Sequence, residues 1–357
     1  MRAPLKVLTL GASYGSLLAS KLLMAGHTVR LVCLPAEVEL FNAEGFRVRM
    51  PVKGMDGLVE IDSRKLPGVM SAGGTADFDP KDFDLVALAM QEPQYRSPGV
   101  RELMERVAKA KVPCMSIMNM PPLAYLKRIR MLDVAALRDC YTDATVWDAF
   151  DPALMTLCSP DPQAFRPPDE KINVLQVRLP TNFKAAGFES AAHTALLRRL
   201  AEDIDAVRFD ASGRKVELPV KLRVHESVFV PLAKWAMLLA GNYRCVQKDG
   251  MRSIKDAVHS DLQTSRAVYE WVVEVCTSLG ADRKDLVPFE KYANAALSLA
   301  SPSSAARALA NGAANIERAD RLVQAIGAQK GMRSAEVDRT VALVDGWLEA
   351  NRRKAKP

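Results

Sequence analysis

The feature that most constrains the fold is the stretch KVLTLGASYGS at residues 6–16. Residues 6–10 have the length and apolar character of a buried strand, Gly11 permits a tight turn, and the apolar pattern over 17–24 predicts a helix. The unpaired N–H groups at the start of a helix behind such a turn attract a pyrophosphate. The stretch therefore predicts a dinucleotide site made by Gly11, Ala12, Ser13, Tyr14 and Gly15.

The glycine spacing departs from the usual Gly-x-Gly-x-x-Gly pattern of such sites. The pattern calls for three glycines, whereas this chain has Gly11, Ser13 and Ser16, with Gly15 one residue out of step. One glycine of the usual turn is therefore replaced or deleted. A turn kept only for packing is the alternative interpretation.

Composition indicates an ordinary globular protein. A chain of 357 residues, 49% hydrophobic and 25% charged, can bury a sizeable core and is long enough for two domains. The glycines at 11 and 15 interrupt the N-terminal apolar stretch, which argues against a signal peptide, and no apolar run has the length to span a bilayer. We therefore expect a cytoplasmic protein without a membrane partner. Its six scattered cysteines lack Cys-x-x-Cys spacing and are expected to be reduced and mostly buried.

The net charge of +7 does not indicate a nucleic-acid protein, because the basic residues are dispersed. The one dense basic run, at 352–356, is expected to be a solvated tail. A modest positive excess also suits a phosphate-bearing cofactor and a carboxylate substrate.

Two different patterns divide the chain. Before about residue 200, buried strands alternate with helices; after Val216 almost everything carries a helical period. We therefore expect an α/β Rossmann-type domain over 1–200 and a mostly α-helical domain over 201–357. The expected strands are 27–34, 46–50, 82–90, 112–118, 172–179 and 206–209, and the expected helices are 35–44, 99–110, 191–204, 253–279, 303–314, 316–328 and 335–351.

Polar residues follow several of the expected strands. In an open α/β sheet, ligands bind beyond the carboxyl ends of the strands, so Gly11, Gln91 and Asn119 are expected to border one crevice. Gln91 and Asn119 are accordingly predicted to contact the cofactor, and Asn119 also the substrate. A helix cap before Pro121 is an equally good interpretation of Asn119.

The choice of nicotinamide cofactor depends on the end of the second strand, where an acid favours NAD and an arginine favours NADP. Here the position falls at Cys33 and Leu34, which are neither. Arg47, Arg49 and Lys53 lie just beyond and favour NADP (NADPH). The alternation over 46–50 suits the solvent face of a strand equally well.

Four segments together resemble the ketopantoate reductase (2-dehydropantoate 2-reductase) family. Members of that family join an N-terminal Rossmann domain to a helical C-terminal domain, of the kind also found in 6-phosphogluconate dehydrogenase. They reduce a small 2-oxo acid to a 2-hydroxy acid with NADPH in the interdomain cleft. The resemblance implies an enzyme of this type and, by analogy, a homodimer. The segments are LGASYG at 10–15, MNM at 118–120, KLRVHESVFVPL at 221–232, and PSSA at 302–305 with NIE at 315–317.

The resemblance also assigns roles to individual residues. It implies that Lys221 is the catalytic lysine, that Asn119 is the cleft asparagine, and that Glu317 is the acidic residue of a late helix. Ser303 or Ser304 matches the serine that binds substrate.

The chain departs from the family pattern at several of these places. The family lysine is followed by asparagines four and eight residues on, where this chain has His225 and Phe229. Gln91 replaces a family lysine and Met120 a glycine. The general scaffold is therefore kept better than the specific substrate pocket.

The chemistry of a reductase suggests roles for Lys221 and His225. Hydride delivery to a ketone leaves charge on oxygen, so a reductase needs a proton donor beside that oxygen, and Lys221 is the candidate. His225, one helical turn later, is expected on the same side, where it would bind the substrate or lower the lysine's pKa. No histidine has cysteine or carboxylate partners at ligand spacing, so no metal site is predicted.

Each residue also has an ordinary structural interpretation. Lys221 would be a solvated charge, Glu317 would pair with Arg321 on a helix surface, and Ser303 or Ser304 would cap a helix. Two other functions stay open. One is an opine-type dehydrogenase in which His225, beside Glu226, is the acid–base group. The other is a degenerate nucleotide-binding or scaffold protein without catalysis, which the missing glycine, Met120 and Phe229 favour.

Overall fold

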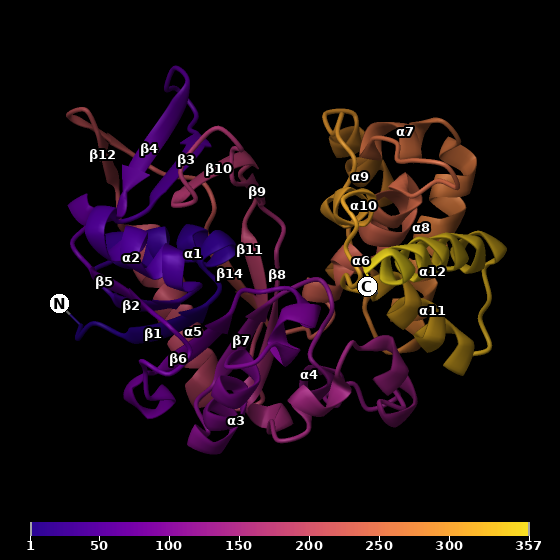
Figure 1. Cartoon of the computed structure of the whole chain (residues 1–357), viewed down its shortest axis with the longest axis horizontal. Helices are drawn as coiled ribbons and strands as arrows, with labels where there is room; N and C mark the ends of the chain where they lie inside the picture. Colours follow the sequence, from indigo (N-terminus) through magenta and orange to yellow (C-terminus); the bar gives the residue numbers. More distant parts are fainter. Residues whose placement is uncertain (1, 356–357) are drawn as a thin grey trace. The chain divides into compact units, whose positions relative to one another are not determined.

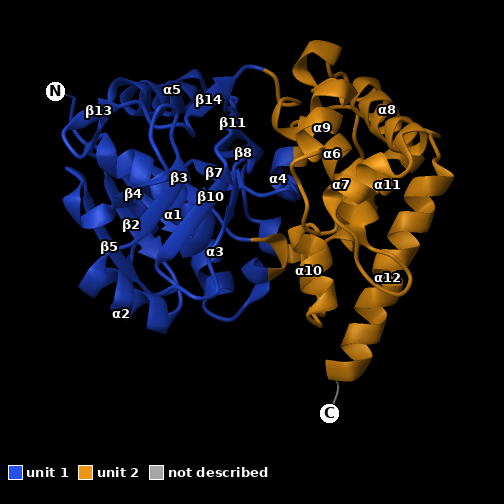
Figure 2. Cartoon of the chain, turned by 90° about the horizontal axis from the view of Figure 1, so that it is seen from above, with its two compact units in different colours: residues 1–90, 94–125, 146–226 blue, residues 91–93, 126–145, 227–357 orange. Residues whose placement is uncertain are grey.

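The computed structural model describes residues 2–355 and divides into two compact units (Figure 2). Unit 1 contains the chain up to Met90 together with 94–125 and 146–226; unit 2 contains 91–93, 126–145 and the chain from 227 onward. This division differs from the expected one at residue 200. Unit 1 extends further because the segment up to Glu226 supplies one more helix and strand to its sheet.

The centre of unit 1 is an eight-stranded sheet of order β5-β2-β1-β6-β7-β8-β11-β14 (Figure 1). The six strands from β5 to β8 are parallel, β11 runs antiparallel to β8, and β14 runs parallel to β11. The six parallel strands, in the order β5-β2-β1-β6-β7-β8, have the 3-2-1-4-5-6 arrangement of dinucleotide-binding folds. The strands are β1 (Lys6–Leu10), β2 (Thr28–Val32), β5 (Val69–Gly73), β6 (Leu85–Leu88), β7 (Cys114–Ile117), β8 (Met155–Ser159), β11 (Phe183–Ala186) and β14 (Leu222–His225).

Helices cover both faces of this sheet. The connections α1 (Ala12–Met24) and α2 (Pro35–Glu44) lie on one face with α5 (Ala191–Ala206), which contacts α1. Helix α3 (Val100–Ala110) lies on the other face (Figure 1). Right-handed crossovers place α3 on the face opposite to α1 and α2, because the strand order reverses direction at β1. The predicted α/β character of the N-terminal part is confirmed.

A second, four-stranded sheet of order β4-β3-β10-β9 packs on the outer side of α1. Helix α1 is thus enclosed between two sheets, and eleven of its thirteen residues are buried. Among them is Lys21, a residue that is only 3% exposed. The strands are β3 (Arg47–Pro51), β4 (Leu58–Asp62), β9 (Gln163–Phe165) and β10 (Val174–Leu179); a separate hairpin is formed by β12 (Phe209–Ala211) and β13 (Arg214–Val216).

Unit 2 is built mainly of helices. A helical run begins at Pro231 and ends at Cys245, and its middle part, Leu238–Asn242 (η8), is a π-helix. A Cβ on Gly241 would overlap the Tyr292 hydroxyl, which donates to the Met237 carbonyl. The main helices are α6 (Lys234–Met237), α7 (Ile254–His259), α8 (Leu262–Ser278), α9 (Phe289–Ala296), α10 (Ser304–Ala310), α11 (Ala319–Gln329) and α12 (Ala335–Ala355).

Two expectations about the C-terminal half need correction. The region after Val216 is not helical at once, because it first forms β14. The basic run at 352–356 was expected to be a solvated tail. Residues 352–355 are exposed, as expected, but they belong to α12, which continues to Ala355, and Arg352 donates to the Ala314 carbonyl at 2.9 Å. Lys356 lies outside the described residues.

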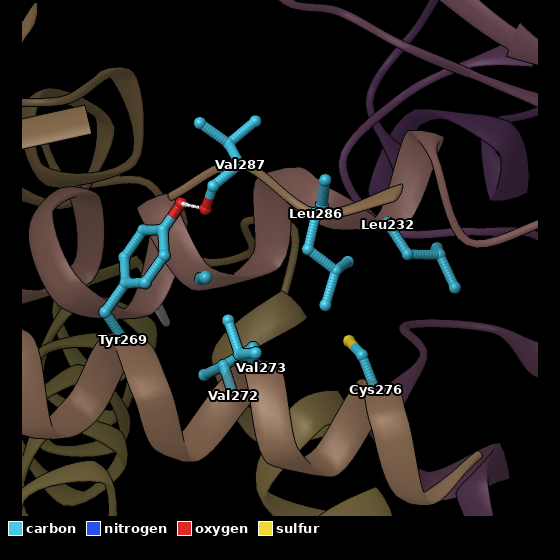
Figure 3. A pocket seen from close by; sticks show the side chains of 9 residues that line it. Leu232, Tyr269, Val272, Val273, Cys276, Leu286 and Val287 are labelled. Atoms are coloured by element: carbon cyan, nitrogen blue, oxygen red, sulfur yellow. Dashed lines mark hydrogen bonds between the residues drawn. The ribbon is translucent and has the colours of Figure 1, made fainter. Parts of the chain in front are cut away.

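A small apolar gap remains in unit 2 between α6 and α8 (Figure 3). Tyr269 closes one end by donating to the Val287 carbonyl at 2.7 Å. The gap is too small for a water molecule, so it is a packing gap and not a ligand site.

The six cysteines all lie in the described part of the chain and form no disulfide. Five are buried, as predicted. Between residues 2 and 355, the helices are too short or too polar to cross a bilayer.

Candidate cofactor and substrate sites

The turn after β1 requires glycine. Gly11 has a φ of 100°, and its N–H donates to the Val32 carbonyl at 2.9 Å. A Cβ at this position would lie 2.6 Å from Met90 Cγ and 2.8 Å from the Ala89 carbonyl oxygen. Such contacts are too short for carbon. The turn therefore tolerates no side chain here.

The helix that follows begins without a side-chain cap among the described residues, and its first turn contains no acidic residue. Its leading backbone N–H groups, from Ala12, Ser13 and Tyr14, have no intrahelical acceptor. They lie at the carboxyl edge of the parallel strands, so the helix dipole and these donors favour an anion there. The arrangement fits a pyrophosphate.

Gly15 has a packing role. A Cβ there would lie 2.6 Å from Thr9 Cγ2, so the missing side chain lets α1 approach β1 closely. The last glycine of the usual fingerprint does the same. Although Gly15 is out of step in sequence, it supplies that part of the motif.

The Tyr14 side chain is committed to packing. Its hydroxyl donates to the Pro160 carbonyl at 3.2 Å, and its ring meets Phe183 edge-on with centroids 6.2 Å apart. Burial raises the pKa of Tyr14, with a smaller contribution from Asp161. Only the backbone of Tyr14 is therefore available to a ligand.

Asn119 lies two residues beyond β7 and is half-buried. It shares the carboxyl edge with Gly11 and is separated from it by two strand spacings, about 10 Å. The expected neighbourhood of these two residues is compatible with the sheet order. Gln91 follows β6 but belongs to unit 2.

Lys221 directly precedes β14 at the same edge, five strand spacings or about 24 Å from the glycine turn. Its ammonium lies 2.9 Å from Asp205 Oδ1 and also pairs with Glu217. Burial lowers the pKa of Lys221, but hydrogen bonds to Glu217 and Asp205 outweigh it and raise the pKa. Its partners make Lys221 a poorer acid than a free lysine.

The predicted helical relationship of Lys221 and His225 is wrong. His225 ends strand β14, so the four-residue step spans about 13 Å along a strand. Because β14 is antiparallel to the central strands, His225 lies at the edge where those strands begin. The two residues therefore lie at opposite edges of the sheet.

Two of the three basic residues after β2, Arg47 and Arg49, are paired with carboxylates, whereas Lys53 lies on an exposed turn. Arg49 donates to Glu60 at 2.7 Å and to Glu170 at 2.5 Å, and Arg47 lies 3.4 Å from Glu60. Both arginines project from one face of β3 in the second sheet. The alternation over 46–50 therefore reflects the surface of a strand in the second sheet.

In unit 2, Ser303 is a helix cap. Its hydroxyl accepts from the Ala306 N–H at 3.1 Å and donates to the Asn242 carbonyl at 2.7 Å. It is buried, whereas Ser304 is exposed on the first turn of α10. The capping interpretation of Ser303 is confirmed.

Glu317 lies in the loop before α11, so the predicted spacing on a helix surface does not apply. It is buried, its carboxylate accepts from the Glu92 N–H at 3.4 Å, and its carbonyl accepts from Tyr243 at 2.5 Å. Glu92 in turn accepts from the N–H and hydroxyl of Thr142. Glu317 is thus held next to the short segment that contains Gln91.

Lys234, the first residue of α6, is not among the residues predicted from the sequence. Lys234 is half-buried, and Asn242 follows eight residues later on the same helical run. The family lysine also has an asparagine eight residues on. That spacing was the signal; the residue four positions on is Leu238 instead of asparagine. The same run contacts Ser303 through Asn242 and Glu317 through Tyr243.

The sequence matches no protein-family profile and no curated protein. Solved structures do match over almost the whole length. The 2-dehydropantoate 2-reductase of Methylococcus capsulatus has a TM-score of 0.65 at 14% identity, covering 99% of each chain. A probable 2-dehydropantoate 2-reductase of Bacillus subtilis has a TM-score of 0.63 at 13% identity, covering 96% of this chain and 100% of its own.

The chain has the ketopantoate reductase fold. D-mandelate dehydrogenase, solved as a ternary structure with NADH and anilino(oxo)acetate, shares this fold with a TM-score of 0.62 at 14% identity, covering 97% of this chain and 99% of its own. The predicted fold, a Rossmann-type domain followed by a helical one, is confirmed. At sequence identities this low, a shared fold does not establish the reaction or the residues that carry it out.

Proposed function

We propose that this chain is an NADP-dependent oxidoreductase that reduces a small 2-oxo acid to a 2-hydroxy acid. The observation that carries the proposal is the uncapped N-terminus of α1 behind Gly11, at the carboxyl edge of a doubly wound sheet. The solved dehydrogenase with NADH and an oxo acid derivative supports the same class.

The chain's own groups supply binding and a proton. The N–H groups at Ala12, Ser13 and Tyr14 hold the pyrophosphate, and Asn119 lies along the same edge. A bound nicotinamide supplies the hydride. The oxygen that gains charge as the hydride arrives needs a cationic donor, and a lysine ammonium meets this need.

We place Lys234 in that role in preference to Lys221. Lys221 is held by Asp205 and Glu217, which raise its pKa. Lys234 begins a helical run whose middle part is a π-helix, a feature that often marks functional sites. The adjoining Asn242, Ser303 and Glu317 match the family's polar residues in kind. Glu317 is proposed to orient substrate or lysine, and Ser304, which is exposed, to contact the carboxylate.

The first test is cofactor binding. NADPH and NADH are titrated separately while nicotinamide fluorescence is followed. The second is a panel of short 2-oxo acids with NADPH absorbance as readout. Saturable binding and turnover of one acid are expected. Binding without turnover of any acid would favour the nucleotide-binding scaffold instead.

The catalytic lysine is tested with a matched pair of variants. Lys234→Met removes the ammonium and keeps an apolar stem, so kcat should fall by about 10² or more with cofactor affinity unchanged. Lys221→Met should leave kcat within a few-fold. A larger fall of kcat in Lys221→Met than in Lys234→Met would instead identify Lys221 as the proton donor. Loss of activity in His225→Asn alone would favour the opine-type mechanism, against the placement of His225 at the other edge of the sheet.

We also propose a homodimer. A ketopantoate reductase from Staphylococcus aureus described as dimeric shares the fold, with a TM-score of 0.60 at 9% identity, covering 97% of this chain and 100% of its own. Sedimentation equilibrium tests this directly; a single species of 39.1 kDa would contradict it.

A further inference from the structure

An arginine from the second sheet reaches the end of β2. Arg166 directly follows β9, and its Nη1 lies 2.6 Å from Glu37 Oε1. Glu37 belongs to the first turn of α2, the helix that begins right after β2. Arg166 also influences the electrostatics of the Cys33 thiol, which ends this strand segment. The end of β2, which has no charged residue of its own at Cys33 and Leu34, is therefore approached by an arginine from more than 120 residues away in the sequence.

The two side chains of this ion pair differ in their exposure to solvent. Glu37 is buried, at 8% side-chain exposure, and its Oε2 accepts from the Leu34 N–H at 3.0 Å. Both carboxylate oxygens are thus occupied and covered. The Arg166 side chain is 27% exposed, so a ligand at this end of β2 meets the cation and not the acid.

The guanidinium is also incompletely satisfied. Its Nη2 is buried and makes no hydrogen bond to any described residue. An unpaired buried donor is unfavourable, and more so when it is charged. A small outward rotation of the guanidinium would let Nη2 donate a hydrogen bond to an anionic ligand bound at the surface. The pairing with Glu37 fixes the other side of the group.

We infer that Arg166 is the residue that selects NADP, by binding the 2′-phosphate of the adenosine ribose. This assignment rests on the proposed nicotinamide-dependent function. The end of the second strand is where an acid accepts from the ribose hydroxyls or an arginine meets the extra phosphate. A guanidinium is suited to phosphate because it donates two parallel hydrogen bonds. Arg166 is a cofactor-specificity residue, and Glu37 positions it.

Equilibrium binding of NADPH and NADH to the full chain and its variants tests the inference, without any substrate. Arg166→Met should weaken NADPH about 10- to 100-fold, the loss of one charge-assisted phosphate contact, and leave NADH within about threefold. Arg166→Lys should recover part of the NADPH affinity. Glu37→Gln should tighten NADPH several-fold, since one negative charge near the phosphate is removed.

Arg178→Met is the matched control. Arg178 lies on β10, and its guanidinium carbon stacks 4.2 Å above the centroid of the Phe165 ring. It should change neither affinity. Equal weakening of NADPH and NADH in Arg166→Met would show a merely structural role and overturn the inference.

Two further results separate this inference from the proposed function. If the unmodified chain binds both nucleotides and Arg166→Met leaves their ratio unchanged, the assignment of Arg166 fails while the proposed function stands. If the unmodified chain binds neither nucleotide, the proposed function fails and this inference with it. Thermal melting of each variant confirms that it is folded.

Discussion

The Nζ atom of Lys221 lies 2.9 Å from Oδ1 of Asp205, and Arg223 donates to the other oxygen of the same carboxylate at 2.6 Å. Glu217 holds the Lys221 ammonium from a second side. The lysine thus joins the end of α5 to the start of β14. Its environment is that of a structural cation in unit 1.

Lys221→Met should therefore lower stability. Its side chain is only 15% exposed, but its partners are partly solvated, so we expect a loss of about 1 kcal/mol. Urea unfolding measures it. Arg208→Met, which removes an exposed partner of the same Glu217, should cost less. Unchanged stability in Lys221→Met would contradict a structural role.

The buried Lys21 predicts a pH-dependent effect. Burial, together with the nearby Lys221 ammonium, lowers the pKa of Lys21 from its ordinary 10.5 to about 7. Between these values the unfolded chain binds a proton that the folded chain does not, so this residue's contribution to stability rises with pH. The penalty of burying the charge is largest at and below pH 7.

Lys21→Met removes that penalty. The variant should be more stable than the unmodified chain near pH 7.5, and this advantage should shrink by about 1.4 kcal/mol per pH unit toward pH 9.5. Unfolding by urea at three pH values measures the difference. Lys53→Met, on an exposed turn, is the control for loss of a lysine. An advantage that grows with pH would show that the sign is wrong.

Gly11→Ala should be costly in two ways. The φ of 100° strains any residue with a Cβ, at roughly 1–2 kcal/mol, and the added carbon would press against Met90 and the Ala89 carbonyl. Gly26→Ala is a matched control, because Gly26 has a φ of 82° but nothing within 4 Å of an added Cβ. Gly11→Ala should lose more stability than Gly26→Ala, and it alone should weaken the cofactor. Unchanged cofactor affinity would mean that the turn is structural only.

Ser303→Ala should destabilise unit 2 by about 1–2 kcal/mol, because it removes the cap of α10 and leaves the Asn242 carbonyl without that donor. Ser304→Ala removes an exposed hydroxyl and should change stability by less than about 0.5 kcal/mol. Chemical denaturation compares the two. If Ser304→Ala raises KM for a 2-oxo acid while stability is unchanged, Ser304 is the substrate serine; equal stability losses would contradict the capping assignment.

Local sequence determined most individual elements. The turn glycine at 11, the helix that starts at Pro35 and ends before Gly45, and the amphipathic α3 follow from periodicity and chain-breaking residues within a few positions. Such signals are local because side chains three or four residues apart share a helix face, and alternate ones share a strand face. The α/β fold with a helical C-terminal part was predictable for this reason.

Tertiary structure alone decided which polar residues meet. Whether 221–225 is a helix or a strand depends on pairing with β11, which no window of neighbouring residues reveals. The placement of Arg166 beside Glu37 depends on β10 pairing with β3, across a gap of more than 120 residues. Burial of Lys21 depends on a second sheet covering α1. Long-range strand pairing fixes these positions because hydrogen bonds between distant segments and the burial of their shared face, rather than local preference, set the register.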